Sequence, residues 1–144
     1  MNYSFEESLG RITHQVSKGL GKKLVKKFSE KNYQIDSYEW TVISYLANNQ
    51  KAIQNDIAIF MGLNKVRVMR ILDDLEKQGY IKRTIAKSDK RQNKVQLTPA
   101  GKKLYNNLEP MAGETLKEIY SDLHAKEIEQ CINTLKKIQQ KLPD

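Results

Sequence analysis

The spacing of the apolar residues changes twice along this chain, and the order of the changes restricts the fold more than any other feature. From about residue 4 to residue 78, apolar side chains recur every three or four positions, as on one face of an amphipathic helix. Over 81–85 and 95–97 they partly alternate, which is typical of a β-hairpin. Helical spacing returns after Pro99. The pattern predicts a mainly helical protein with one small hairpin, an α+β fold.

Local signals mark where the helices begin and end. Asp36 followed by Glu39 is a variant of the capping box, and Thr98 places a hydroxyl cap ahead of Pro99 in a first turn. Gly62 suits the left-handed position that closes a helix. The expected helices cover 4–31, 36–50, 53–61, 64–78, 99–121 and 125–142. The residues expected on the inner faces of the middle three are Trp40, Ile43, Ala47, Ile53, Ile57, Phe60, Val68, Ile71, Leu72 and Leu75.

Three short helices followed by a hairpin form a winged helix-turn-helix, which we expect over 36–98. The long helices expected within 1–35 and 99–144 carry apolar stripes that such a small unit cannot cover alone. We therefore predict that they are dimerisation helices, which bury these stripes against a second copy of the chain in a homodimer. No internal repeat or linker divides the sequence, so 1–144 is expected to be a single domain.

The charge balance points to a polyanionic partner. Lys and Arg number 25 against 17 Asp and Glu, which gives a net charge of +8 and a pI near 9.5. Residues 99–144 are neutral, so the excess lies in the first two-thirds of the chain. A basic excess of this size is typical of proteins that bind nucleic acid or anionic membranes. The cations are not confined to one face of an apolar helix, which argues against a membrane surface.

The sequence contains no residue pattern typical of an enzyme. His14 and His124 lie far apart, and neither a phosphate loop, a zinc-spaced cluster nor a nucleophile motif occurs. We therefore expect no catalysis, no metal and no cofactor. A single cysteine, Cys131, cannot form a disulfide within one chain, and the N-terminal residues do not resemble a signal peptide. The lone cysteine fits a reducing compartment, so we expect a cytoplasmic protein. No run approaches the roughly 18 apolar residues of a membrane span.

The residues from 53 to 75 can be read as a helix-turn-helix. Ala58 is small where two helices must approach, and Gly62 makes the turn four residues later. Arg67 and Arg70 then share a face near the start of the second helix, where recognition helices contact bases in the major groove. The alternative is that Arg70 and Asp74 form an ordinary surface pair.

The hairpin tip is the second basic element. Residues 81–94 hold six cations and one acid, Asp89, which is close enough to Arg91 to stiffen the loop. Such a tip can contact phosphates or the minor groove, and the alternative is a soluble turn without a partner. The residues expected to bind DNA are Gln54, Asn64, Lys65, Arg67, Arg70, Lys87, Asp89, Lys90, Arg91 and Lys94.

Residues 36–101 resemble the MarR family of bacterial regulators. The matching segments are Trp40-Thr41-Val42-Ile43, Ile57-Ala58, Gly62-Leu63, Arg70 to Ile81, Asp89-Lys90-Arg91 and Val95 to Gly101. The wing pattern, Asp-x-Arg followed by Leu-Thr-x-x-Gly, is the most specific of them. The resemblance implies an intertwined dimer that binds a pseudopalindromic operator as a repressor, and its release by a small phenolic or anionic ligand.

Some residues depart from the family pattern. Val66 and Met69 stand where many members carry Ser or Thr in the recognition helix. The peroxide sensors of the family use a cysteine in the first helix, whereas Cys131 is in the last, where we expect a small core or seam residue. Zinc sensing is not supported, because one cysteine and two histidines offer no site.

The resemblance also directs attention to four aromatic residues that could line a ligand cavity. They are Tyr38, Trp40, Tyr45 and Tyr105. The alternative is that these residues are plain core. A different function also stays open at this point, namely a winged helix that binds RNA or a protein partner without a ligand response. A basic recognition helix paired with a basic wing favours double-stranded DNA.

Overall fold

The computed structural model describes residues 4–85 and 93–143, which form six helices and a two-stranded antiparallel sheet. The elements, in chain order, are α1 (Leu9–Glu30), α2 (Ser37–Asn48), α3 (Gln54–Met61), α4 (Lys65–Lys77), β1 (Ile81–Ile85), β2 (Asn93–Leu97), α5 (Pro99–Ile119) and α6 (Ala125–Gln139). This order confirms the predicted fold class, a mainly helical winged helix-turn-helix with long helices at both ends.

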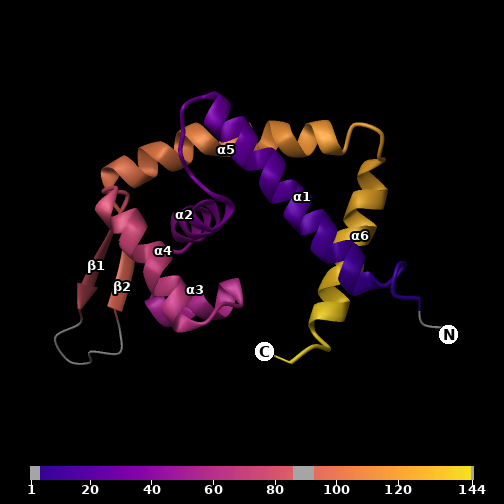
Figure 1. The fold of residues 1–144 in the computed structure, drawn as a ribbon, viewed down its shortest axis with the longest axis horizontal. Helices are drawn as coiled ribbons and strands as arrows, with labels where there is room; N and C mark the ends of the chain where they lie inside the picture. The colour runs from indigo at the N-terminus through magenta and orange to yellow at the C-terminus, as the bar shows by residue number, and fades with distance from the viewer. Residues whose placement is uncertain (1–3, 86–92, 144) are drawn as a thin grey trace.

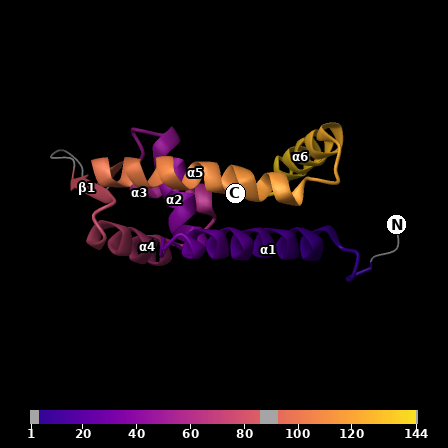
Figure 2. The same ribbon diagram turned by 90° about the horizontal axis from the view of Figure 1, so that it is seen from above.

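The elements form two parts that α5 connects. Helices α2, α3 and α4 pack with the hairpin at one end of the molecule, and α5 runs from the hairpin to α6 at the other end (Figure 1). Helix α1 crosses between these parts and contacts both α5 and α2. Seen from above, α1 and α4 lie on one side of the molecule, and α5 and α6 on the other (Figure 2). None of the described helices is long and apolar enough to cross a membrane.

The helix ends follow the capping signals of the sequence. The Asp36 carboxylate accepts a hydrogen bond from the Glu39 amide at 2.8 Å, and the Glu39 carboxylate accepts one from the Asp36 amide at 2.9 Å, so the predicted capping box is confirmed. The prediction that the first helix starts at residue 4 is wrong. The helix begins at Leu9, because the Ser8 hydroxyl caps the amide of Arg11.

One hydrophobic core joins the winged helix to α1 and α5. Its fully buried side chains are Phe28, Val42, Ile43, Ile57, Val68, Leu72, Leu75, Ile81, Val95 and Leu108. The predicted inner face of α2 needs correction, since Val42 and Leu46 are buried whereas Trp40 is half-buried. Phe60 was also expected inside but is 59% exposed, and its ring packs on Tyr45 with the centroids 4.5 Å apart.

Helices α1 and α6 present apolar faces that the described residues of one protomer leave uncovered. Helix α6 has no buried residue, and Ile132 and Leu135 remain 43% and 38% exposed. On α1, Ile12 and Val16 are 45% and 54% exposed. In contrast, the other end of α1 is fixed to α5, where Lys27 forms ion pairs with two glutamates. The uncovered surface of these two helices therefore lies at the end of the molecule away from the winged helix.

A tight junction fixes the start of α5 against the turn between α4 and β1. The Thr98 amide donates to the Tyr80 carbonyl at 3.0 Å, and the Thr98 hydroxyl donates to the Gly79 carbonyl at 2.5 Å. The same hydroxyl accepts from the Gly101 amide at 3.1 Å. Gly101 is buried so closely against Tyr80 that a Cβ at this position would collide with the Tyr80 carbonyl. This contact explains the glycine of the Leu-Thr-x-x-Gly pattern.

We predict that Gly101→Ala lowers the free energy of unfolding by about 1–3 kcal/mol, because the added methyl group forces backbone apart at the junction. Gly113→Ala in the same helix is the matched control, since its Cβ would meet no atom within 4 Å among the described residues beyond its chain neighbours and the nearby backbone of its own helix. The control should be neutral or stabilising by up to ~1 kcal/mol through helix propensity. Urea unfolding of both variants measures the difference, and equal stabilities would contradict the role given to Gly101.

Candidate nucleic-acid interface

The turn between α3 and α4 has the geometry of a helix-turn-helix. Gly62 adopts φ +62°, in the left-handed region, and the Leu63 amide returns to the Ala58 carbonyl at 3.2 Å. Ala58 is 6% exposed, so a small side chain does lie where the helices meet. The Asn64 carboxamide then caps α4 by accepting from the Arg67 amide at 2.9 Å. The predicted positions of Ala58 and Gly62 are thus confirmed.

Helix α4 has one buried and one exposed face. Val68, Leu72 and Leu75 are fully buried, as predicted. The opposite face exposes the three predicted cations together with two apolar side chains, the residues being Lys65, Val66, Arg67, Met69 and Arg70. Among the ion pairs of the described residues there is none between Arg70 and Asp74, so the surface-pair alternative for Arg70 is not supported.

Arg67 has a neighbour that the sequence did not suggest. Its guanidinium carbon lies 4.5 Å from the centroid of the Tyr38 ring, which belongs to the first turn of α2. This is a cation–π distance. Because Tyr38 and Arg67 are far apart in sequence and belong to different helices, no local pattern could have paired them.

Arg83 is the cation whose role sequence reasoning missed. It was counted with the basic residues of the hairpin, but its guanidinium forms ion pairs with Asp73 and Glu76 of α4, the latter at 2.9 Å. The hydrogen bonds from Arg83 hold the pKa of Glu76 below its usual range and raise the pKa of Arg83 itself. Arg83 therefore joins the wing to α4 and is not a free cation. The i, i+3 spacing of Asp73 and Glu76 is the only sequence signal for this cluster.

The wing is attached to the start of α3. Strand β1 pairs with β2 so that Thr84 lies opposite Lys94, and Lys94 also forms a bridge with Ile53, next to Gln54. The Val95 amide donates to the Ala52 carbonyl at 3.0 Å. The Lys94 side chain is exposed and that of Gln54 is half-buried. Four further predicted contacts lie outside the described residues, namely Lys87, Asp89, Lys90 and Arg91.

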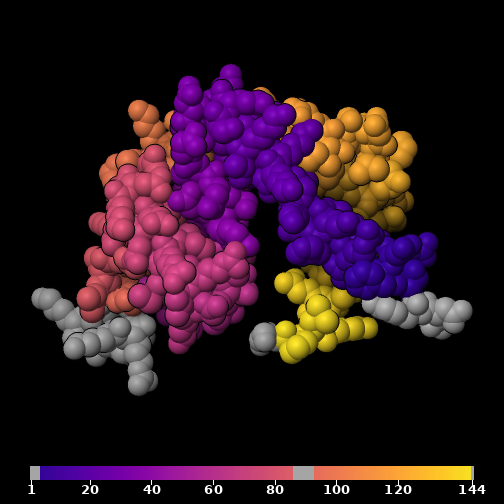
Figure 3. Space-filling view, viewed as in Figure 1, coloured from indigo at the N-terminus to yellow at the C-terminus, as the bar shows by residue number. Residues whose placement is uncertain are grey.

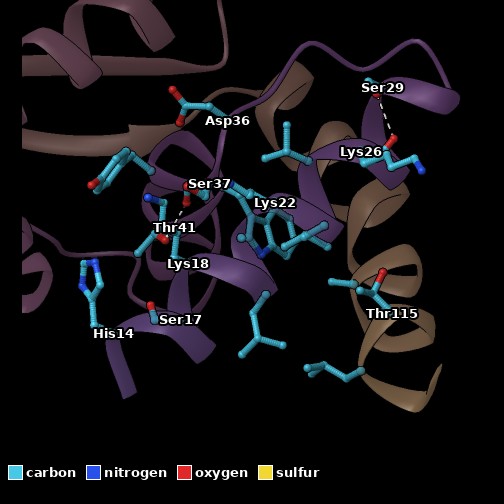
Figure 4. Close-up of a pocket in the computed structure, with 18 residues that line it drawn as sticks. His14, Ser17, Lys18, Lys22, Lys26, Ser29, Asp36, Ser37, Thr41 and Thr115 are labelled. Atoms are coloured by element: carbon cyan, nitrogen blue, oxygen red, sulfur yellow. Dashed lines mark hydrogen bonds between the residues drawn. The ribbon is translucent and has the colours of Figure 1, made fainter. Parts of the chain in front are cut away.

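A cavity of about 1000 Å³ lies between α1, α2 and α5. Figure 3 shows the surface hollowed between the winged helix and α1. In the close-up, Lys18 from α1 lies near Ser37 and Thr41 from α2, while Thr115 enters from α5 (Figure 4). The lining combines cations and hydroxyl groups with apolar side chains such as Trp40. Such a mixture suits a small amphipathic molecule with an acidic group.

Only two of the four aromatic residues predicted to line the ligand cavity line the one between α1, α2 and α5. Tyr38 and Trp40 line the cavity between α1, α2 and α5. Tyr105 instead stacks on Trp40, with the centroids 5.8 Å apart, and lines a smaller cleft of about 580 Å³ beside the wing. Tyr45 packs on Phe60 of α3 and lines neither cavity. The prediction is therefore wrong for Tyr45 and Tyr105.

The described residues contain no group of three or more His, Cys, Asp or Glu side chains that could hold a metal ion. Cys131 is exposed within the protomer, so the expectation of a core position is wrong. It lies on α6, where a position in a seam between two copies stays a prediction.

Comparisons with known proteins agree with this arrangement. A model described as the MarR family matches residues 32–92, which span the helix-turn-helix and the first strand of the wing. The fold is similar to a MarR/EmrR family transcriptional regulator from Acinetobacter sp. ADP1, with a TM-score of 0.85 and 26% identity over 96% of this chain and 97% of that one.

Two further solved structures share the fold. The S. aureus MepR–DNA complex gives a TM-score of 0.81 at 24% identity, over 94% of this chain and 98% of that one. Wild-type MarR from E. coli in its apo form gives a TM-score of 0.75 at 23% identity, over 94% of this chain and 98% of that one. A helix-turn-helix with a hairpin wing between long terminal helices is the architecture of a winged-helix transcriptional regulator. The MarR family model thus matches the helix-turn-helix part of this chain, and the fold as a whole is similar to solved MarR-family regulators.

Proposed function

We propose that this protein is a sequence-specific regulator that binds double-stranded DNA. The observation that carries the proposal is the outer face of α4, where Lys65, Arg67 and Arg70 are exposed in the first half of the second helix of a helix-turn-helix. Residues at the start of a recognition helix reach base edges in the major groove, and the forked donors of arginine pair with guanine. MepR, which shares the fold, was solved with DNA.

The contacts divide by role. We assign base contacts to Arg67 and Arg70, and supporting contacts to Lys65, Gln54 and the amide nitrogen of Asn64. Lys94 lies on the wing, and its exposed ammonium group suits a phosphate. This division predicts that α4 determines which sequence is bound, whereas the wing contributes affinity with little sequence preference.

A winged helix that binds RNA or a protein is the alternative. The exposed face of α4 fits the wide major groove of B-form DNA, whereas the major groove of A-form RNA is too deep and narrow for side chains to read. The geometry therefore favours duplex DNA over RNA.

The protein is proposed to act as a homodimer on a pseudopalindromic operator. The uncovered apolar faces of α1 and α6 support this, because exposed apolar stripes on two long helices are normally buried in an interface. A twofold dimer presents two recognition helices to two half-sites about one helical turn apart. The family resemblance implies that binding represses transcription.

We propose that a small phenolic or anionic ligand releases the operator. The cavity between α1, α2 and α5 supports this proposal, since it offers Lys18 and Lys22 for an acidic group and Trp40 for an aromatic ring. It also touches both the winged helix and the terminal helix α1, so its occupant contacts the two parts of the molecule.

Arg70→Ala is expected to lower operator affinity and to reduce discrimination between operator and random duplex by about 1–3 kcal/mol, because a base contact is lost. Lys94→Ala should weaken both duplexes nearly equally and reduce the salt dependence by about one phosphate. Lys117→Ala, which removes an exposed cation from α5, is the control. Fluorescence anisotropy at two salt concentrations, on an operator selected from random duplex, measures all three. The assignment is reversed if Lys94→Ala changes specificity and Arg70→Ala changes only affinity.

Replacing both Leu135 and Ile138 with Asp should produce a monomer or an unfolded chain that no longer binds operator, because two carboxylates would enter the proposed apolar interface. The control replaces Asn133 and Lys137 with Asp on the opposite face of α6, where dimerisation should persist. Sedimentation equilibrium gives the mass, and circular dichroism gives the helix content. A folded, dimeric and fully active Leu135/Ile138 double variant would rule out this interface.

Titration with salicylate and 4-hydroxybenzoate should give a saturable change in the fluorescence of Trp40, the single tryptophan, together with release of operator. Replacing Lys18 and Lys22 with Met should weaken this response, because the cationic side of the cavity is lost. Lys31→Met, outside the cavity, is the matched control. The absence of any saturable response across a broad panel of aromatic acids would argue against the ligand.

A further inference from the structure

The contact between Tyr38 and Arg67 joins two helices of the winged helix at the base-contacting surface. Tyr38 is the second residue of α2 and Arg67 the third residue of α4, and the guanidinium carbon lies 4.5 Å from the ring centroid. We infer that Tyr38 is a positioning residue that holds the Arg67 guanidinium in the orientation required for DNA contact. This inference rests on the proposed function, because it assumes that Arg67 contacts the operator.

The geometry of stacking explains why a ring can position an arginine without blocking it. A guanidinium above an aromatic face is held through its π surface, while its five N–H donors point outward in its own plane. Bidentate pairing with guanine uses donors in that plane. A ring at 4.5 Å limits the rotamers of a long, flexible side chain, and in the stacked arrangement the donors would stay free, which would lower the entropy lost when Arg67 binds a base.

The backbone at both ends of the contact is fixed. On α4, the Asn64 side chain accepts a hydrogen bond from the Arg67 amide, which holds the first turn of that helix. On α2, the capping box of Asp36 and Glu39 holds the turn that carries Tyr38. Glu39 also accepts a hydrogen bond at 2.9 Å from the Gln78 side chain, at the end of α4. Tyr38 is thus attached to a turn that is itself anchored to the recognition helix.

Arg70 provides an internal comparison. It lies three residues after Arg67 on the same exposed face of α4, but within the described residues no aromatic ring lies beneath its guanidinium. If Tyr38 acts through Arg67, removal of the Tyr38 ring should lower operator affinity only while Arg67 is present. The effects of removing the Tyr38 ring and the Arg70 side chain on operator affinity should simply add.

The test consists of two double-mutant cycles on operator and random duplex, one combining Tyr38→Leu with Arg67→Ala and one combining Tyr38→Leu with Arg70→Ala. Tyr38→Leu should weaken operator binding by up to about two- to fivefold, because the ordering that the ring imposes on Arg67 cannot exceed the strength of an exposed cation–π contact, and it should affect random duplex less. In a protein that already carries Arg67→Ala, Tyr38→Leu should not change operator affinity further. Tyr38→Phe keeps the ring and should retain full affinity, and Tyr38→Met gives a second ring-free variant. Circular dichroism and thermal unfolding confirm that each variant folds.

The outcomes separate this inference from the proposed function. Equal effects of Tyr38→Leu with and without Arg67 would overturn the positioning role and leave DNA binding intact. Tighter operator binding by Tyr38→Leu would also overturn it, since the ring would then be holding Arg67 away from DNA. An Arg67→Ala variant with unchanged affinity would overturn it as well, while Arg70→Ala tests the recognition helix independently. Coupling between Tyr38 and Arg70 of the same size as with Arg67 would indicate a general structural effect and equally contradict the inference.

Discussion

The rest of the winged helix depends on the junction between the turn after α4 and the start of α5. Two backbone carbonyls, those of Gly79 and Tyr80, accept hydrogen bonds from Thr98, and Gly101 lets the first turn of α5 approach them without a side chain between. This junction sets the direction in which α4 leaves the core and the direction in which α5 leaves the wing. The placement of the recognition face relative to the long terminal helices follows from it.

Internal ion pairs determine how much of the basic excess remains for a partner. Arg83 is paired with Asp73 and Glu76, and Lys27 with Glu114 and Glu118 of α5. These cations hold elements together: the first attaches the wing to α4, and the second attaches α1 to α5. The exposed cations of α4, by contrast, have no carboxylate within ion-pair distance among the described residues. A net charge read from composition therefore overstates the charge that the hairpin offers to a partner. It also hides the contribution that the paired cations make to stability.

The predictions that succeeded concern interactions between residues close in sequence. A capping box, a glycine with positive φ and an i, i+3, i+4 stripe each depend on one turn of backbone, so the pattern of Asp36-Glu39, Gly62 and the buried face of α4 could be read directly. The start of α1 failed although its Ser8 cap is local. The failures at Phe60, Arg83 and Tyr105 required knowledge of a partner distant in sequence. Phe60 carries an apolar side chain at a helical spacing, yet it is 59% exposed and packs on Tyr45, whereas Ile57 one turn earlier is fully buried.

The sequence by itself determined the order of the elements, their approximate ends, the small residue and the turn of the helix-turn-helix, and the family resemblance. These depend on periodicity, caps and turns, which are local. Only the tertiary structure decided which side chains meet across elements. Arg67 lies over the Tyr38 ring, Arg83 pairs with Glu76, and Trp40 lines the cavity and stacks on Tyr105. The physical reason is that such contacts are set by the directions in which helices leave the core. Those directions depend on close packing at the junction of Tyr80 and Gly101, which no local periodicity encodes.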